Sequence, residues 1–226
     1  MNQYVIAGIH PWNRRIFEDR IAKLPGQWVF FDKRQDLELE RLTEIGPQFI
    51  FFLHWSWKVA TEILDRFTCI NFHMTDLPYG RGGSPLQNLI LRGHQETKLT
   101  AFRMTDDMDE GPIYMKDPLL LNGSAQQIYE RASLLACDMI ARFVNAPNEP
   151  VLQSGEVTLF ARRNPAESEL GTFGDVDSLY DFIRMLDADG YPRAFVRRGH
   201  LRLEFSNALL DGNGLLSANV NVVEES

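Results

Sequence analysis

Apolar and amphipathic segments alternate along the first third of the chain. Four short apolar runs predict buried strands, at residues 4–9, 28–31, 49–53 and 68–73. The segments between them repeat apolar residues at three-to-four spacing and predict helices, at residues 13–24, 37–45 and 59–67. The run at 49–53, FIFFL, is apolar throughout, which is typical of a parallel strand covered on both faces. This alternation predicts an α/β fold with a Rossmann-like, doubly wound, mostly parallel sheet.

The pattern changes further along the chain. We expect helices at 85–92 and 125–145, and strands at 99–104 and 113–118. The stretch NAPNEP then indicates a linker. Beyond it, the pattern predicts three short strands and a helix, at residues 157–160, 194–196, 201–205 and 178–186. We therefore expect a main domain at residues 1–150 and a small, β-rich C-terminal subdomain at 151–226.

Composition narrows the class of protein. The 226 residues are 44% hydrophobic, enough for a real core, and two cysteines cannot form a disulfide framework. No stretch approaches the ~20 apolar residues of a membrane span, and the first residues do not resemble a signal peptide. We therefore expect a cytoplasmic protein without a membrane partner. The formal net charge of −8 disfavours a nucleic-acid partner, although it does not exclude a local basic patch.

The stretch CINFHMTDLPYGRGGS, residues 69–84, carries the candidate chemistry. Asn71 and His73 are two residues apart, so on a strand they point to the same face. The glycines that follow predict an irregular loop, and Ser84 before Pro85 has the pattern of a helix N-cap. A strand, a polar pair, a glycine loop and a helix start are typical of a ligand site in an open α/β sheet. Taken alone, an Asn-x-His pair is more often a structural polar cap than a catalytic pair.

The motifs INFHMTDLPYGRGGSP and MTDDMDEGPIY resemble those of the folate-dependent formyltransferases. That superfamily includes glycinamide ribonucleotide and methionyl-tRNA formyltransferases and the nucleotide-sugar N-formyltransferases. The resemblance implies a catalytic set of Asn71, His73 and Asp109, with Asp109 following His73 by 36 residues. It covers residues 45–145 best and makes 1–150 the catalytic domain. The chain departs from the family pattern after the histidine, where Asp76 adds a negative charge.

The resemblance implies N10-formyltetrahydrofolate as the formyl donor and no metal. Asn71 and His73 would donate hydrogen bonds to the developing oxyanion, and losing one such donor typically costs about 10²–10³ in rate. His73 would also take the amine proton, with Asp109 orienting its ring. His54 is interpreted as a structural neighbour and not as a second base. Further residues are implied as folate contacts, namely Trp55, Trp57, Asp106 and Asp107, and as substrate contacts, namely Arg81, Gly82 and Ser84.

Several functions remain open. The first expectation is transfer to a nucleotide-linked amino sugar of the UDP- or dTDP-4-amino-4,6-dideoxy class, as in cell-surface polysaccharide biosynthesis, because the tail resembles that branch of the superfamily. The alternatives are a methionyl-tRNA formyltransferase, for which a larger basic C-terminal domain is expected, and a formyltetrahydrofolate hydrolase. A non-catalytic nucleotide-sugar or folate binding module belongs to a different class. The resemblance also implies a possible homodimer through the C-terminal part.

Overall fold

The computed structural model describes residues 1–225 and divides the chain into two compact units. The sheet unit contains Met1–Gly82, Thr97–Leu119 and Glu130–Leu159. The C-terminal unit contains Gly83–Glu96, Leu120–Tyr129 and the chain from Phe160 onward. Two internal segments therefore belong with the C-terminal residues, and the expected domain boundary near residue 150 stays a prediction.

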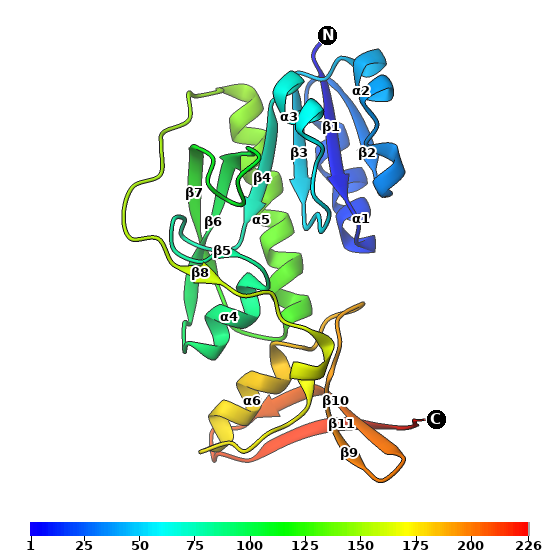
Figure 1. The fold of residues 1–226 in the computed structure, drawn as a ribbon, viewed down its shortest axis with the longest axis vertical. Helices are drawn as coiled ribbons and strands as arrows, with labels where there is room; N and C mark the ends of the chain where they lie inside the picture. Colours follow the sequence, from blue (N-terminus) through cyan, green and yellow to red (C-terminus); the bar gives the residue numbers. More distant parts are fainter. Residues whose placement is uncertain (226) are drawn as a thin grey trace. The chain divides into compact units, whose positions relative to one another are not determined.

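A six-stranded sheet in the order β2-β1-β3-β4-β6-β7 forms the centre of the sheet unit (Figure 1). Its strands are β1 (Gln3–Gly8), β2 (Gln27–Phe31), β3 (Phe49–Leu53), β4 (Cys69–His73), β6 (Glu96–Arg103) and β7 (Ile113–Leu120). The pairs β1–β2, β1–β3 and β3–β4 are parallel, and β4–β6 is antiparallel. The predicted α/β fold with a doubly wound, mostly parallel sheet is confirmed. The parallel strands end at one edge of the sheet, and His73 is the last residue of β4.

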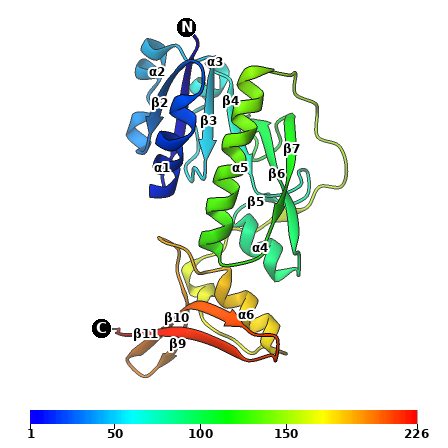
Figure 2. The same ribbon diagram turned by 180° about the vertical axis from the view of Figure 1, so that it is seen from behind.

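Helices cover both faces of this sheet (Figures 1 and 2). They are α1 (Pro11–Asp19), α2 (Leu39–Ile45), α3 (Thr61–Arg66) and α5 (Ala125–Asn145), with 3-10 turns η1 (Ile21–Lys23) and η2 (Arg34–Asp36). Leu42 of α2 and Ile63 of α3 pack with β-strand residues in one buried cluster. On the opposite face Phe143 of α5 contacts Phe49 edge to face, with ring centroids 5.0 Å apart. The helix predicted at 13–24 ends at Asp19 and continues as the 3-10 turn η1.

The C-terminal unit contains an antiparallel sheet in the order β11-β10-β9. Its elements are α4 (Pro85–Leu91), η3 (Pro165–Ser168), α6 (Val176–Arg184), β9 (Ala194–Arg198), β10 (Leu201–Leu210) and β11 (Leu216–Glu224). The predicted β-rich appendage is confirmed, but β11 was not predicted. The glycine loop is also less irregular than predicted, because β5 (Arg81–Gly82) pairs with β8 (Leu159–Phe160). A homodimer through this part of the chain stays a prediction.

Both cysteines of the chain are buried free thiols. Burial raises the pKa of Cys69 to about 12, and burial likewise raises the pKa of Cys137 to about 12. Both side chains therefore behave as small apolar residues, as predicted. Among residues 1–225, no helix combines the length and apolar character that crossing a membrane requires.

Candidate active site

His73 ends β4 and is buried, with 7% of its side chain exposed. Its Nε2 lies 2.8 Å from the carbonyl oxygen of Gly80 in the glycine loop. A carbonyl oxygen can only accept a hydrogen bond, so Nε2 carries the hydrogen. In the neutral ring Nδ1 is then the unprotonated nitrogen. Nδ1 lies 3.7 Å from Oδ2 of Asp109. The loop therefore fixes which nitrogen of His73 can take up a proton.

Asp109 lies in the loop between β6 and β7, residues 104–112, and 11% of its side chain is exposed. Its φ of 56° is left-handed, which costs most non-glycine residues about 1 kcal/mol and is tolerated best by Asp and Asn. Gly82 donates its backbone N–H to Oδ2 over 2.9 Å. Gly111 closes the loop, since a Cβ there would lie 1.6 Å from the carbonyl oxygen of Arg103. The loop thus presents one carboxylate to the His73 ring.

Asn71 lies two residues before His73 on β4 and on the same face. Its Oδ1 accepts the backbone N–H of Phe72 over 3.0 Å. That contact orients the amide, and Nδ2 is the end that carries hydrogen-bond donors. Asn71, His73 and Asp109 together offer a donor, a proton acceptor with a defined nitrogen, and a carboxylate beside the ring. This set can support proton transfer beside a developing oxyanion, and the individual catalytic roles stay predictions.

Arg81 follows Gly80 in the glycine loop and is held within the sheet unit. Its guanidinium donates Nε and Nη2 to Oε1 of Gln153, over 3.1 and 2.9 Å, and Nη1 lies 2.9 Å from Oε1 of Glu110. Only 11% of its side chain is exposed. The predicted substrate contact would compete with these interactions. Gly82 contributes its N–H to Asp109, so its observed contact is with the site itself. The substrate roles of Arg81 and Gly82 remain predictions.

Ser84 directly precedes α4, and Pro85 is the first helical residue, as predicted. The predicted side-chain cap is wrong: among the described residues, the Ser84 hydroxyl makes no capping bond to α4. Its backbone is left-handed, with φ of 48°, so its hydroxyl is directed elsewhere. The oxygen accepts the backbone N–H of Arg163 over 3.1 Å. This contact ties together two segments of the C-terminal unit, and a substrate role for Ser84 remains a prediction.

Trp55 and Trp57 lie on the loop after β3 and contact each other edge to face, with centroids 5.0 Å apart. Trp55 packs against the core cluster under α2 and α3, whereas Trp57 is exposed. The indole Nε1 of Trp55 is buried and has no hydrogen-bond partner within residues 1–225. Buried indole N–H groups usually have a partner. This loop therefore offers aromatic surface at the exposed Trp57, whereas the indole N–H of Trp55 lies inside the protein.

Asp106 and Asp107 are exposed residues of the loop 104–112. Asp106 accepts the hydroxyl of Thr61 over 2.6 Å and so links the loop to the start of α3. It also lines a surface hollow of about 400 Å³. The residues around this hollow are Leu64, Asp65, Arg103, Met104, Thr105, Asp106 and Pro112, which do not include the three candidate catalytic residues. The predicted folate contacts of Asp106 and Asp107 remain predictions.

His54 follows β3 and has a left-handed backbone, with φ of 52°. Its Nδ1 lies 3.3 Å from the hydroxyl of Ser133 on α5. Burial, with a smaller contribution from the nearby His10, lowers the pKa of His54 to about 3. A ring with that pKa is neutral at pH 7 and is a very weak base. The expectation that His54 is structural agrees with these contacts.

Asp76 was expected to add negative charge near the site, but its charge is compensated. Lys98 Nζ lies 3.0 Å from Oδ2, and Lys116 Nζ lies 2.5 Å from Oδ1. Partial burial by itself raises the pKa of the Asp76 carboxyl, but the combined hydrogen bonds and charges of the two lysines outweigh it and lower the pKa. The local charge of this cluster is therefore positive, not negative.

This cluster predicts a pH-dependent effect on stability. A carboxyl whose folded-state pKa is lowered stabilises the protein at pH values above its unfolded pKa and loses this effect as the pH falls through the folded pKa. Because 42% of the Asp76 side chain is exposed, we expect Asp76→Asn to cost no more than about 1 kcal/mol at pH 7. Thermal unfolding at pH 7, 5 and 3.5 should show a difference in Tm that shrinks at the lowest pH. An unchanged difference at all three values would contradict this assignment.

Gln153 is a residue of the site region that the sequence analysis missed. It lies in the stretch assigned to the C-terminal subdomain, yet its amide contacts both Arg81 and the backbone beside Asp109. Its neighbours on either side are exposed, and nothing in the sequence distinguishes it from a solvated polar residue. Among the described residues, no group of three or more His, Cys, Asp or Glu side chains is placed to hold a metal ion.

Two family models match the chain. The Formyl transferase family matches residues 32–142, which include Asn71, His73 and Asp109. The family described as "Methionyl-tRNA formyltransferase, C-terminal domain" matches residues 165–223. The first match covers the strands and loops that build the site, and the second covers α6 and the antiparallel sheet.

Solved structures and curated proteins agree with these matches. A structure named methionyl-tRNA formyltransferase from Clostridium thermocellum is 41% identical, has a TM-score of 0.93, and is aligned over 99% of this chain and 100% of that one. The methionyl-tRNA formyltransferase of Wolbachia pipientis is 24% identical over 77% of this chain, which spans 59% of that protein. A sugar N-formyltransferase from a Shewanella species shares the fold, with a TM-score of 0.64, 16% identity, and coverage of 97% and 96%.

The fold and the family matches therefore define the class of protein as the formyltransferases. The chain belongs to the formyltransferase family. The predicted superfamily is confirmed. The family membership does not decide which acceptor the protein uses. This chain spans only 59% of the length of the curated methionyl-tRNA formyltransferase that it matches.

Proposed function

We propose that the protein transfers a formyl group from N10-formyltetrahydrofolate to a primary amine. One observation carries the proposal: the His73 ring donates Nε2–H to Gly80 and turns Nδ1 toward the Asp109 carboxylate at 3.7 Å. An amine that attacks a formyl carbon must lose a proton. A ring with one defined basic nitrogen beside a buried carboxylate is suited to accept it.

The three residues have complementary tasks in this proposal. The donor, when bound, supplies an activated one-carbon unit attached to nitrogen. Asn71 Nδ2 donates a hydrogen bond to the formyl oxygen, where negative charge develops. His73 Nδ1 takes the proton that the acceptor nitrogen loses as it bonds to the formyl carbon, and Asp109 stabilises the imidazolium. The imidazolium returns that proton to the departing nitrogen of the donor, so protons balance without another reactant.

The loop after β3 fits the donor. A pterin ring is flat and carries several hydrogen-bonding atoms at its edge. Trp55 and Trp57 supply aromatic surface of the kind on which such a ring stacks.

Methionyl-tRNA is the acceptor that the comparisons support best. The Clostridium thermocellum structure of that name is 41% identical over essentially the whole of both chains. The match at residues 165–223 is to the C-terminal domain of the same class. These similarities support the methionyl-tRNA alternative better than the amino-sugar expectation. They also place the expected absence of a nucleic-acid partner in question.

A nucleotide-linked amino sugar remains the second candidate because of one specific observation. The sequence from residue 160 to the end contains seven arginines, no lysine and eleven acidic residues. Proteins that bind tRNA usually neutralise phosphates with an excess of basic residues. An acidic segment is easier to reconcile with a small acceptor.

A single set of assays distinguishes the acceptors. The protein is mixed with N10-formyltetrahydrofolate alone, with methionyl-tRNA, or with UDP- and dTDP-amino sugars, and release of tetrahydrofolate is followed. Mass spectrometry checks that the acceptor has gained a formyl group. Uncharged tRNA and sugars without an amino group are the matched controls. A tRNA reaction should also weaken steeply as salt increases, because phosphate contacts are lost.

We expect tetrahydrofolate release to require methionyl-tRNA. Release that requires an amino-sugar nucleotide would assign the second candidate. Release with water alone would identify a formyltetrahydrofolate hydrolase, and binding without any product would identify a binding module. Either of the last two results would refute formyl transfer to an amine.

A further inference from the structure

A segment without regular structure runs beside both loops of the site. We call residues 150–158 the strap; Figure 1 shows it in yellow-green, leading to β8. At one end Val151 and Ile113 exchange two backbone hydrogen bonds, of 2.7 and 2.8 Å. At the other end the Thr158 carbonyl oxygen accepts the N–H groups of Gly80 and Arg81, both over 3.0 Å. The strap is therefore fixed to the start of β7, directly after the loop 104–112, and to the glycine loop.

Gln153 uses its whole side-chain amide between these two anchor points. Nε2 donates to the carbonyl oxygens of Asp109 and Gly111, over 2.7 and 2.8 Å. Oε1 accepts two hydrogen bonds from the Arg81 guanidinium, over 3.1 and 2.9 Å. Guanidinium only donates and carbonyl only accepts, so the amide has one workable orientation. If the amide were flipped, its NH₂ group would face the Arg81 guanidinium and its oxygen would face the two carbonyl oxygens, so all four hydrogen bonds would be lost.

Arg81 links the same loop a second time. Its Nη1 lies 2.9 Å from Oε1 of Glu110, the residue between the two carbonyls that Gln153 binds. The next residue along, Gly82, donates its N–H to the Asp109 carboxylate over 2.9 Å. Gln153 therefore binds the backbone carbonyl of Asp109, and Gly82 binds its carboxylate. This explains how a left-handed, non-glycine residue keeps its carboxylate beside the His73 ring.

We propose that Gln153 is a positioning residue, which holds Asp109 in reach of Nδ1 of His73 through the backbone of the loop 104–112. The inference rests on the proposed function. Gln153 contacts neither His73 nor the reacting atoms, and it acts only through Asp109. Losing its two donor bonds frees the carbonyls of Asp109 and Gly111, and the loop can then relax away from β4. A displacement of about 1 Å at such a site can cost about 10²-fold in rate.

Two substitutions test the separate contributions of the Gln153 side-chain Nε2 and Oε1. Gln153→Leu removes all four hydrogen bonds at similar size. Gln153→Glu keeps an acceptor for Arg81 but places a carboxylate oxygen against two carbonyls. We expect both variants to lower kcat by about 10–100-fold, with the KM for the formyl donor changed less than twofold. Asn148→Leu is the matched control, because Asn148 also donates its amide to two backbone carbonyls but does not contact the loop 104–112.

Hydrogen exchange provides a readout that does not depend on activity. The Gly82 amide is protected by its bond to the Asp109 carboxylate. We expect its exchange, followed by NMR, to speed up at least about tenfold in Gln153→Leu and to match Asp109→Ala, while Asn148→Leu resembles the wild type. In addition, Gln153→Leu added to Asp109→Asn should cause no further loss of kcat.

Unchanged Gly82 exchange in Gln153→Leu would overturn the inference, whatever the activity. A full multiplicative loss in the double variant would also overturn it, since Gln153 would then act independently of Asp109. If the wild type transfers no formyl group to any acceptor, the proposed function fails, and Gly82 exchange still decides whether Gln153 holds Asp109.

Discussion

His73→Ala is expected to lower the kcat of formyl transfer by about 10²–10⁴ while binding of tetrahydrofolate persists. The substitution removes the nitrogen that the site orients as a proton acceptor, since Nε2 bonds to the Gly80 carbonyl oxygen and Nδ1 faces Asp109. The reason is that general base catalysis typically contributes a factor of about 10²–10⁴ to the rate, and the variant loses this factor. Folate binding is assigned to other residues, so the Kd for tetrahydrofolate measured by calorimetry should change little.

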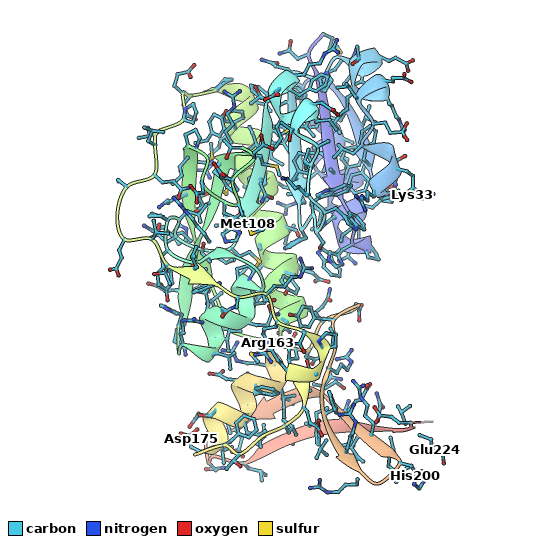
Figure 3. The ribbon with its side chains drawn as sticks, in the orientation of Figure 1. Lys33, Met108, Arg163, Asp175, His200 and Glu224 are labelled. Carbon is cyan, nitrogen blue, oxygen red and sulfur yellow. The ribbon has the colours of Figure 1, made fainter. Side chains whose placement is uncertain are left out.

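His200→Ala is the matched control for this experiment. His200 is exposed at the turn between β9 and β10, at the tip of the hairpin (Figure 3). This variant should keep the wild-type kcat and KM. Full activity of His73→Ala would remove His73 from the mechanism, and loss of both activity and folate binding would point to damage of the fold instead.

Asp109→Asn is expected to lower kcat by about 10²–10³. An amide keeps an acceptor for the Gly82 N–H but loses the charge beside the ring. Two unit charges about 4 Å apart interact by ~4 kcal/mol at an effective dielectric constant of about 20, and each 1.4 kcal/mol is a factor of ten. His73 and Asp109 are separated by 3.7 Å and are both largely buried, so this estimate applies with little screening.

Steady-state kinetics and thermal unfolding together check the Asp109 prediction. The value of Tm should stay within a few degrees of the wild type, because Asn also tolerates a left-handed backbone. Asp107→Asn removes the same charge from an exposed position on the same loop. Because Asp107 is a predicted folate contact, its effect should fall on the KM for the donor, with kcat within a few-fold of the wild type. Comparable losses in both variants would show that the loop's total charge matters, and not the position of Asp109.

Much of the sheet unit follows from local sequence pattern. The strand 49–53 and the helix 125–145 were predicted with the bounds that the structure has, since an apolar run and a long periodic segment carry strong signals. The motif around Asn71 and His73 also carries enough information to indicate the family from sequence alone. A separation of 36 residues connected Asp109 to them, and the structure brings that residue to 3.7 Å from the ring.

Other features depend on contacts between residues that are distant in the sequence, and no local sequence pattern predicts them. Gln153 is 72 residues from Arg81, and no periodicity marks it as part of the site. Arg81 was predicted to contact substrate, and nothing in the sequence indicated that its guanidinium also contacts Gln153 and Glu110. The strand β11 was missed although Ala218, Val220 and Val222 alternate with polar residues. Asparagines between them lower intrinsic strand propensity, and pairing with β10 overrides it.

The two buried cysteines have a practical consequence. Thiolate is the form that reacts with alkylating reagents, and a thiol with a pKa of about 12 is almost entirely protonated at neutral pH. We therefore expect the two native cysteines of the folded protein not to react with maleimides. A single cysteine introduced at Met108, whose side chain is 71% exposed beside Asp109 (Figure 3), would carry a fluorophore at one defined place. Movements of the loop 104–112 could then be followed in solution by fluorescence without first removing the native thiols.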